Sequence, residues 1–443
     1  MATKKTGGKL TLKRDLNLFT ATMIGVGIIV GAGIYALIGA ASGLAGNAVW
    51  LSFTISAIVA AFTGLSFAEL SSRFPKDAGE YTYTEKAFGK NVAFLTGYLV
   101  IAAGIISAAA VALGFSGYFA ALFKTNLALP IIAIAALAVF SLINYYGVKQ
   151  SANLNVFLTL AEVSGLIIVI FLGMKYFGHV DYTAMPNGIG GVLSAASLIF
   201  FAFLGFESVV KLAEETKNPT KVIPKALILS LIISTILYIL VGIAAVSAVG
   251  WEKLSTSSAP LADVAGAVFG SSTFTILALI ALLSTANTVL IIILATSRIL
   301  YGMGSEKVLP SILGKISPLR RTPGIAILVT FIFASIFALI GDISTVAEIT
   351  NFAVFLTFIA VNAAVIYLRY KAPVKSGFKV PLSIGKFPIL PALGIITSIF
   401  MLINLSFIVI LGGIGLTVLG IVFFEIMKRV NNKHTKKKNR TRK

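Results

Sequence analysis

The stretch Gly25-Val26-Gly27-Ile28-Ile29-Val30-Gly31-Ala32-Gly33-Ile34-Tyr35 lies inside the first long apolar segment, residues 16–42. Each glycine inside a helix costs about 1 kcal/mol relative to alanine, so such a cluster in an apolar helix needs a reason. One reason is close helix packing, because Gly27 and Gly31 stand four residues apart. The other is a helix that stops and restarts at Gly31-Ala32-Gly33, where the N–H groups of the second half-helix would face a carboxylate.

The composition is that of a polytopic membrane protein. Apolar residues make up 58% of the 443-residue chain and charged residues only 12%. Apolar runs of about 20 residues, long enough to cross a bilayer as helices, recur along the chain. Cysteine is absent, which excludes disulfides and thiolate chemistry. We predict about twelve spans, near residues 16–42, 46–71, 92–122, 129–147, 153–176, 190–213, 224–249, 273–300, 323–341, 345–369, 388–409 and 412–429.

The net charge of +20 is explained by topology. With the N-terminus inside, all but three of the 36 Lys and Arg residues (Lys124, Lys175 and Lys253) fall in segments on the inner side of the membrane. This positive-inside bias predicts a multi-pass protein of the cell membrane with both termini cytoplasmic. The basic C-tail, residues 430–443, is expected to be a disordered flank that touches anionic lipid. No nucleic-acid partner is expected, since no folded or aromatic scaffold accompanies the tail.

The sixth span, like the first, contains residues that would interrupt a helix. Phe200-Phe201-Ala202-Phe203-Leu204-Gly205-Phe206-Glu207-Ser208 places a glycine and an acid in mid-span. Short amphipathic segments that end in Phe-Gly, residues 77–89 and 259–270, also stand at matching places in the two halves. Interrupted spans at corresponding positions point to an inverted repeat with the binding site between its halves. The expected division is an N-tail (1–15), repeat 1 (16–178), repeat 2 (189–369), two further spans (388–429) and a basic C-tail (430–443).

An ordered set of separated motifs resembles the amino acid–polyamine–organocation superfamily, near its cationic-amino-acid-transporter-like bacterial and archaeal branch. The motifs are Gly25-Val26-Gly27 to Gly31-Ala32-Gly33-Ile34, Phe74-Pro75-Lys76-Asp77-Ala78-Gly79-Glu80-Tyr81, Asn144-Tyr145-Tyr146-Gly147-Val148-Lys149, Gly205-Phe206-Glu207 with Lys217-Asn218-Pro219, and Ser297-Arg298-Ile299-Leu300-Tyr301-Gly302-Met303. The resemblance covers nearly the whole chain. It implies an all-α fold with a five-plus-five inverted repeat, broken helices one and six and two C-terminal helices. It also implies amino acid transport by alternating access.

The chemistry of a zwitterion agrees with that resemblance. N–H groups that open a half-helix suit a carboxylate, and carbonyls that end one suit an ammonium. By similarity to the superfamily, Ile29, Phe201, Ala202 and Leu204 would supply the carbonyls and Phe203 an aromatic gate, although a buried Phe at this spacing is otherwise ordinary core. The residues expected to contact the substrate are Ile29, Gly31, Ala32, Gly33, Ile34, Phe201, Ala202, Phe203, Leu204, Gly205 and Asn287. Uncharged walls, such as Ala102-Ala103-Gly104-Ile105-Ile106-Ser107-Ala108, predict a neutral amino acid.

Two acids, Glu162 in span five and Glu207 in span six, are predicted deep in the membrane. Ionisable groups there are costly and suggest function. Burial favours the uncharged carboxyl, so either could carry a proton. Glu207 stands where the superfamily often has an acid, which implies gating, while the alternative is a neutral carboxyl that hydrogen-bonds the unwound backbone. Many relatives place a lysine at the position of Glu162. A carboxylate there could instead bind sodium with hydroxyls such as Ser284, or titrate with the proton.

The sequence argues against a membrane enzyme and leaves two other functions open. A membrane enzyme would require clustered ligands or catalytic groups, but both histidines, His179 and His434, fall outside the spans. An inorganic-cation transporter or channel on the same fold remains open because of the two buried acids, as does a binding-only amino acid sensor. We expect no cofactor and no metal apart from the sodium alternative. The expected partners are an amino acid, the lipid bilayer, a proton or sodium, and a second copy of the chain through spans eleven and twelve.

Overall fold

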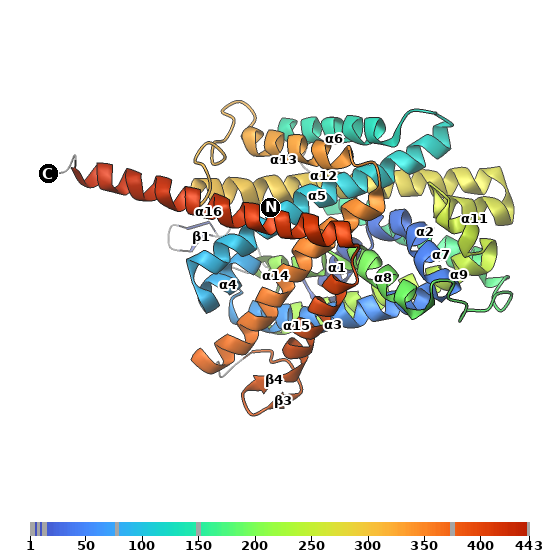
Figure 1. Ribbon diagram of the computed structural model, residues 1–443, viewed down its shortest axis with the longest axis horizontal. Coiled ribbons are helices and arrows are strands. Elements are labelled where there is room, and N and C mark those ends of the chain that lie inside the picture. Colours follow the sequence, from blue (N-terminus) through green and yellow to red (C-terminus); the bar gives the residue numbers. More distant parts are fainter. Residues whose placement is uncertain are drawn as a thin grey trace.

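The computed structural model describes residues 16–75, 79–147, 152–372 and 377–440, together with two short strands near the N-terminus, β1 (Lys5–Thr6) and β2 (Lys9–Leu10). The described chain is almost entirely helical, which confirms the predicted all-α polytopic fold (Figure 1). Eight of its helical stretches are long and apolar enough to cross a membrane, and shorter apolar helices accompany them. Together these helices account for all twelve predicted spans. The rest of the predicted N-tail, residues 1–4, 7–8 and 11–15, lies outside the described residues.

The first half of the chain opens with a helix that is interrupted, as predicted. The first span consists of α1 and α2, which are separated by Val30 and Gly31. The elements of this half are α1 (Leu18–Ile29), α2 (Ala32–Ala45), η1 (Gly46–Ala48), α3 (Val49–Arg73), α4 (Glu80–Phe88), α5 (Lys90–Phe123), α6 (Leu129–Tyr146) and α7 (Ala152–Met174).

The second half opens with an interrupted helix too. The sixth span begins as α8, tightens into the 3₁₀ helix η2, and resumes after Leu204 and Gly205 as the 3₁₀ helix η3. The elements of this half are α8 (Gly188–Ile199), η2 (Phe200–Phe203), η3 (Phe206–Glu215), α9 (Pro219–Val249), α10 (Trp251–Ser255), α11 (Pro260–Phe269), α12 (Ser271–Ser305), α13 (Gly324–Ala338) and α14 (Ile343–Lys371).

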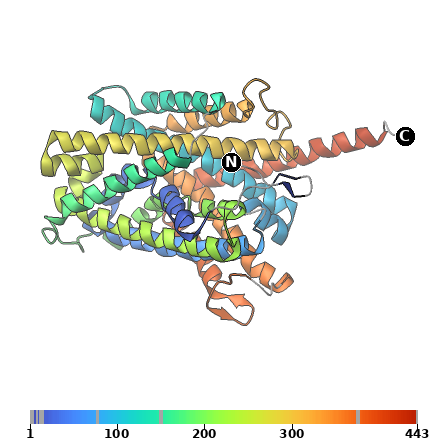
Figure 2. The same cartoon turned by 180° about the vertical axis from the view of Figure 1, so that it is seen from behind.

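The two halves present their elements in the same order. In each, a broken span is followed by one long helix, a short amphipathic helix, and then a helix of more than thirty residues, α5 or α12; the second half has one additional short helix, α10, before α11. Gly89 and Gly270, with φ of 86° and 83°, make the turns from the short helices α4 and α11 into α5 and α12. The short helices lie at opposite ends of the molecule (Figures 1 and 2), as the prediction of one inside and one outside requires.

Two long helices pack against each other at the centre and support the broken spans. A Cβ added to Gly104 of α5 would overlap the side chain of Thr296 of α12, so this crossing depends on the missing side chain. A Cβ added to Gly114 would lie 2.7 Å from the Cβ of Ala36 in α2. Small residues therefore bring α5 close to both α12 and the first span, in the manner usual for membrane helices.

The C-terminal part holds β3 (Ser383–Ile384), β4 (Phe387–Pro388), α15 (Ile389–Ile403) and α16 (Phe407–Arg440). The prediction that the basic tail is disordered is wrong for residues 430–440, because α16 continues to Arg440 and projects beyond the bundle (Figure 1). No glycine or proline follows Gly420 to stop the helix, and extension of a formed helix costs far less than its nucleation. The last predicted tail residues, 441–443, lie outside the described part of the chain.

Candidate functional site

The first break is built by the backbone of Val30 and Gly31. Val30 has ψ of 68° and Gly31 is extended, with φ −107° and ψ −154°. The N–H of Gly31 donates to the carbonyl of Ile29 at 2.8 Å, which turns the chain out of α1. Gly31 has no side chain with which to cap α2, and Ala32 and Ile34 are fully buried. A buried helix start that lacks a side-chain cap needs acceptors from elsewhere, and a carboxylate would supply them.

One acceptor at this helix start comes from α12. The N–H of Ala32 lies 3.3 Å from Oγ1 of Thr288, a long hydrogen bond. The hydroxyl of Thr288 itself donates to the carbonyl of Ser284 at 2.9 Å, so its orientation is fixed by its own helix. Thr288 directly follows Asn287 in the sequence, but it was not among the residues expected to contact the substrate.

The second break is organised around Gly205, whose φ of 113° favours glycine. The N–H of Gly205 donates to Oε2 of Glu207 at 2.9 Å, so this carboxyl binds the unwound backbone. This contact is the one expected if Glu207 serves to hydrogen-bond the unwound backbone. A role of Glu207 in gating stays a prediction. On the other side of the break, Phe203 is fully buried and its ring packs on Tyr238 with centroids 5.2 Å apart.

The two breaks touch each other. A Cβ added to Gly33 would lie 2.6 Å from the Cα of Ala202, and one added to Gly205 would lie 2.9 Å from the carbonyl oxygen of Ile28. The glycines of the first span therefore serve both predicted purposes, since Gly27 also packs so closely on Thr159 of α7 that a Cβ would overlap it.

Tyr238 of α9 joins the two breaks. Its hydroxyl lies 2.8 Å from the carbonyl oxygen of Ile29 and 2.9 Å from that of Ala202, and the side chain is fully buried. One hydroxyl carries one hydrogen and can donate to only one of these two carbonyls at a time. Sequence reasoning missed Tyr238. A signal existed, because a tyrosine in the middle of an apolar span must find a partner for its O–H.

Glu162 lies in α7 behind the first break and is only 2% exposed. Its Oε1 is 3.5 Å from Nδ2 of Asn287, and the nearby hydroxyl of Ser284 is buried with no hydrogen-bond partner among the described residues. The backbone carbonyl of Glu162 accepts a hydrogen bond from the hydroxyl of Tyr35 at 2.5 Å. The structure thus brings Glu162, Ser284 and Asn287 together beside the first span, with Asn287 turned toward the acid.

Three further acids, Glu69, Glu348 and Glu425, lie at the edges of the predicted spans. Glu69 forms an ion pair with Arg369, and Glu425 forms a looser, exposed one with Lys428 at 3.8 Å. Glu348 instead accepts hydrogen bonds from Ser406, at 2.7 Å from Oγ and 3.2 Å from N. Within the described residues, no group of three or more His, Cys, Asp or Glu side chains could hold a metal ion.

Comparison with known families decides the identity of the fold. A family model described as "Amino acid permease" matches residues 16–423, which is nearly the whole chain. The chain belongs to this family. The permease is therefore a multi-pass membrane transporter, and amino acid transport is its function. This confirms the resemblance inferred from the glycine and loop motifs.

Relatives of this permease carry several kinds of amino acid. It is 31% identical to the branched-chain amino acid permease BcaP of Bacillus subtilis, over 97% of its own length and 96% of that protein. It is 32% identical to the glutamate/serine transporter AimA of the same organism, over 81% and 72% of the two chains. Cationic amino acid transporter 4 of mouse is 30% identical over 82% of this chain and 60% of its own. The family alone therefore does not select a side-chain class.

Proposed function

We propose that this permease carries a neutral amino acid by alternating access, with the zwitterion held between the two breaks. The observation that carries the proposal is the pair of carbonyls, Ile29 and Ala202, that share one tyrosine hydroxyl. The Tyr238 hydroxyl can donate to only one of these carbonyls at a time, and Ile29 also accepts from the N–H of Gly31, whereas an ammonium group offers three donors. A substrate ammonium that reaches this point supplies the donor that the Ala202 carbonyl lacks while Tyr238 binds Ile29.

The carboxylate of the same substrate binds at the start of α2. Ala32, Gly33 and Ile34 lie in the first turn of that helix, where N–H groups are not used within the helix. The helix dipole adds a favourable interaction with negative charge, about 0.3–1 kcal/mol at an exposed site and more when buried. Because Gly33 touches Ala202, the half-helices must separate to admit the substrate, which couples binding to a change of conformation.

The side-chain pocket is proposed to be apolar. Span three contributes Ala102, Ala103 and Ile105, each no more than 8% exposed, with no charge to pair a cationic or acidic substrate. The similarity to a branched-chain amino acid permease over 97% of the chain supports an aliphatic substrate. Phe201, Phe203 and Leu204 would close over that side chain, and Gly205 would provide the turn.

Glu162 is proposed to couple transport to a proton or to sodium. Its carboxyl is buried between α7 and the polar face of α12, and the backbone of Glu162 is tied to the first span through Tyr35. Protonation would remove a buried charge, while sodium would be held by the carboxylate with the hydroxyl of Ser284. Glu207 is proposed to steady the sixth span in one gating state through its bond to Gly205.

The remaining features of the proposal concern the assembly. The positive-inside bias supports cytoplasmic termini in the cell membrane, and the matching element order supports inverted repeats at residues 16–178 and 189–369. Spans eleven and twelve, outside the repeats, are proposed to pack or to form a homodimer. The permease is proposed to have no enzymatic activity.

Uptake into proteoliposomes tests the function. A panel of unlabelled amino acids would compete with labelled leucine, at two pH values and with or without sodium. Competition by neutral aliphatic amino acids and weak competition by lysine or glutamate are expected. Preferential competition by lysine or glutamate would refute the neutral substrate. Cation flux that does not depend on any added amino acid would instead support an inorganic-cation transporter.

A further inference from the structure

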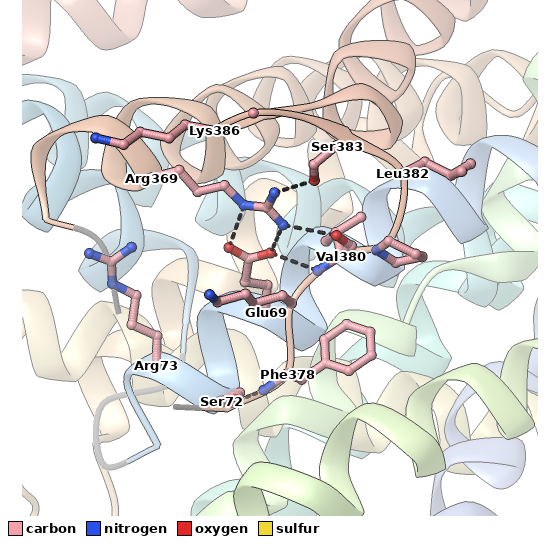
Figure 3. Close-up of a pocket in the computed structure, with 12 residues that line it drawn as sticks. Glu69, Ser72, Arg73, Arg369, Phe378, Val380, Leu382, Ser383 and Lys386 are labelled. Atoms are coloured by element: carbon pink, nitrogen blue, oxygen red, sulfur yellow. Dashed lines mark hydrogen bonds and ion pairs between the residues drawn. The ribbon is translucent and has the colours of Figure 1, made fainter. Parts of the chain in front are cut away.

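We propose that a pocket beside the β3–β4 hairpin binds the phosphate headgroup of an anionic membrane lipid. The pocket lies far in sequence from the two breaks and encloses about 470 Å³ (Figure 3). It is formed by the ends of α3 and α14 and by the segment that leads into α15. Its lining is Glu69, Ser72, Arg73, Arg369, Phe378, Lys379, Val380, Pro381, Leu382, Ser383, Gly385 and Lys386.

The walls of this pocket are fixed by hydrogen bonds. Arg369 pairs with Glu69, and it also donates to Ser383 Oγ at 2.6 Å and to the carbonyl of Val380 at 3.0 Å. The N–H of Val380 donates to Glu69 at 2.8 Å, and that of Phe378 to Ser72 Oγ at 2.8 Å. The loop is therefore fastened to both helices. Its cationic side chains extend from a fixed backbone, so binding of an anion does not have to order the loop.

The pocket has an excess of positive charge. Glu69 is the single acid among the lining residues, and both of its oxygens are already used by Arg369 and Val380. Arg73 donates to the carbonyls of Leu368 and Ala372, not to a carboxylate. In the described chain neither Lys379 nor Lys386 forms an ion pair. Among the described residues, Arg73, Lys379 and Lys386 thus line the pocket without a carboxylate in an ion pair with any of them.

The hairpin beside these cations exposes apolar side chains. Leu382 is 64% exposed and Ile384 is 73% exposed. Gly385, with φ of 61°, opens the two-residue turn, and Lys386 follows it at the tip. Figure 3 shows Arg73 and Lys386 on one side of the Glu69–Arg369 pair and Leu382 on the other. The hairpin itself lies at the periphery of the bundle (Figure 1), between the predicted spans 345–369 and 388–409.

This combination selects a lipid over a soluble anion. A free phosphate would contact only the cations. The exposed side chains of Leu382 and Ile384 would then stay in unfavourable contact with water. A lipid satisfies both sets, because its phosphate meets the cations while its acyl chains meet the aliphatic side chains. Basic pockets at the ends of membrane helices bind anionic headgroups in this way.

Native mass spectrometry of the purified full-length permease in an uncharged maltoside detergent tests the proposal. The probes are phosphatidylglycerol and phosphatidylcholine of the same acyl chains. We expect tighter binding of phosphatidylglycerol, and a loss of about fivefold in its affinity for each lysine removed in the variant Lys379→Ala/Lys386→Ala. The matched control, Lys217→Ala/Lys221→Ala, removes two exposed lysines outside the pocket lining and should bind phosphatidylglycerol as the unaltered protein does.

A second variant separates the lipid from a soluble ligand. Leu382→Ser/Ile384→Ser keeps every cation and should weaken phosphatidylglycerol several-fold while leaving the weak binding of glycerol 3-phosphate unchanged. Equal affinity of the Lys379→Ala/Lys386→Ala variant and its control for phosphatidylglycerol would overturn the proposal, as would equal affinity for the two lipids. Displacement of phosphatidylglycerol by micromolar glycerol 3-phosphate would replace the lipid by a soluble anion. Thermal unfolding of each variant confirms that it is folded.

Discussion

The two broken spans reach the same result by different means. The first passes from one α-helix to another through two residues, and three of its glycines, Gly27, Gly31 and Gly33, sit against side chains or backbone of neighbouring elements. The sixth passes through two 3₁₀ helices, and its glycine, Gly205, supplies a left-handed turn. The first break thus joins two α-helices through an extended glycine, whereas the second joins two 3₁₀ helices through a left-handed glycine.

This difference has a consequence for motion. A 3₁₀ helix has poorer hydrogen-bond geometry than an α-helix and rarely runs beyond three or four residues, yet η3 covers Phe206–Glu215. The second half of the sixth span is therefore held less firmly by its own backbone than α2 is. We infer that η3 is the half-helix that rearranges more easily when the breaks separate.

The largest expected effect is at the contact between the breaks. Gly33→Ala places a Cβ 2.6 Å from the Cα of Ala202, and backbone cannot move aside as a side chain can. Forced overpacking costs about 1–3 kcal/mol, so we expect uptake in proteoliposomes to fall about tenfold or more. Gly415→Ala in α16 is the control, since no atom lies within 4 Å of the Cβ that it would gain. Equal activity of both variants would show that the breaks need no close contact.

The next effect separates the two acids that accompany the breaks. Glu162→Gln removes the charge that we assign to coupling, whereas Glu207→Gln keeps an oxygen that can accept from Gly205. Coupling between two ligands is typically about 5- to 150-fold. We expect that the proton or sodium gradient no longer stimulates uptake by Glu162→Gln but still stimulates uptake by Glu207→Gln. Full gradient dependence in both variants would contradict the assignment.

A smaller effect concerns the hydroxyl that joins the breaks. Tyr238→Phe leaves the buried carbonyls of Ile29 and Ala202 without their shared donor, a loss of about 1–3 kcal/mol. A bound ammonium would replace that donor, so the destabilisation should be larger without substrate than with saturating substrate. Chemical or thermal unfolding in both conditions measures it.

Tyr118→Phe provides the control for this comparison. Its hydroxyl donates to the carbonyl of Tyr35 at 2.8 Å, so it binds the first span but not the pair of carbonyls. Its loss should destabilise the permease equally with and without substrate. If Tyr238→Phe also lowers the stability equally with and without substrate, the substrate ammonium does not bind at these carbonyls.

The smallest effect tests the support that α12 gives to the first break alone. Thr288→Val removes the acceptor for the N–H of Ala32, a long bond worth about 0.5–1 kcal/mol. We expect KM to change about two- to fivefold with little change in kcat. Thr285→Val is the control, because Thr285 bonds only within its own helix. A larger change in Thr285→Val would mean that packing of α12, not the bond to Ala32, supports the break.

Much of the fold could be predicted because its signals are local. Runs of apolar residues give the spans, and Gly31 and Gly205 mark the two breaks without any knowledge of their neighbours. The α-helical continuation of the C-tail to Arg440 was missed because its charges suggested disorder, although no residue there stops a helix. The 3₁₀ form of η3 was missed because the sequence pattern does not distinguish it from an α-helix of similar length.

The site could be predicted only in part, because its contacts join residues far apart in the sequence. Sequence alone determined that the chain crosses the membrane as helices, that two helices are interrupted, and that acids lie at buried depth. The tertiary structure decided that Tyr238 and Thr288 meet the breaks, that Asn287 faces Glu162, and that Gly33 rests on Ala202. Helix interruption follows from residues adjacent in the chain, whereas these contacts join residues up to 256 positions apart and exist only once the helices have packed.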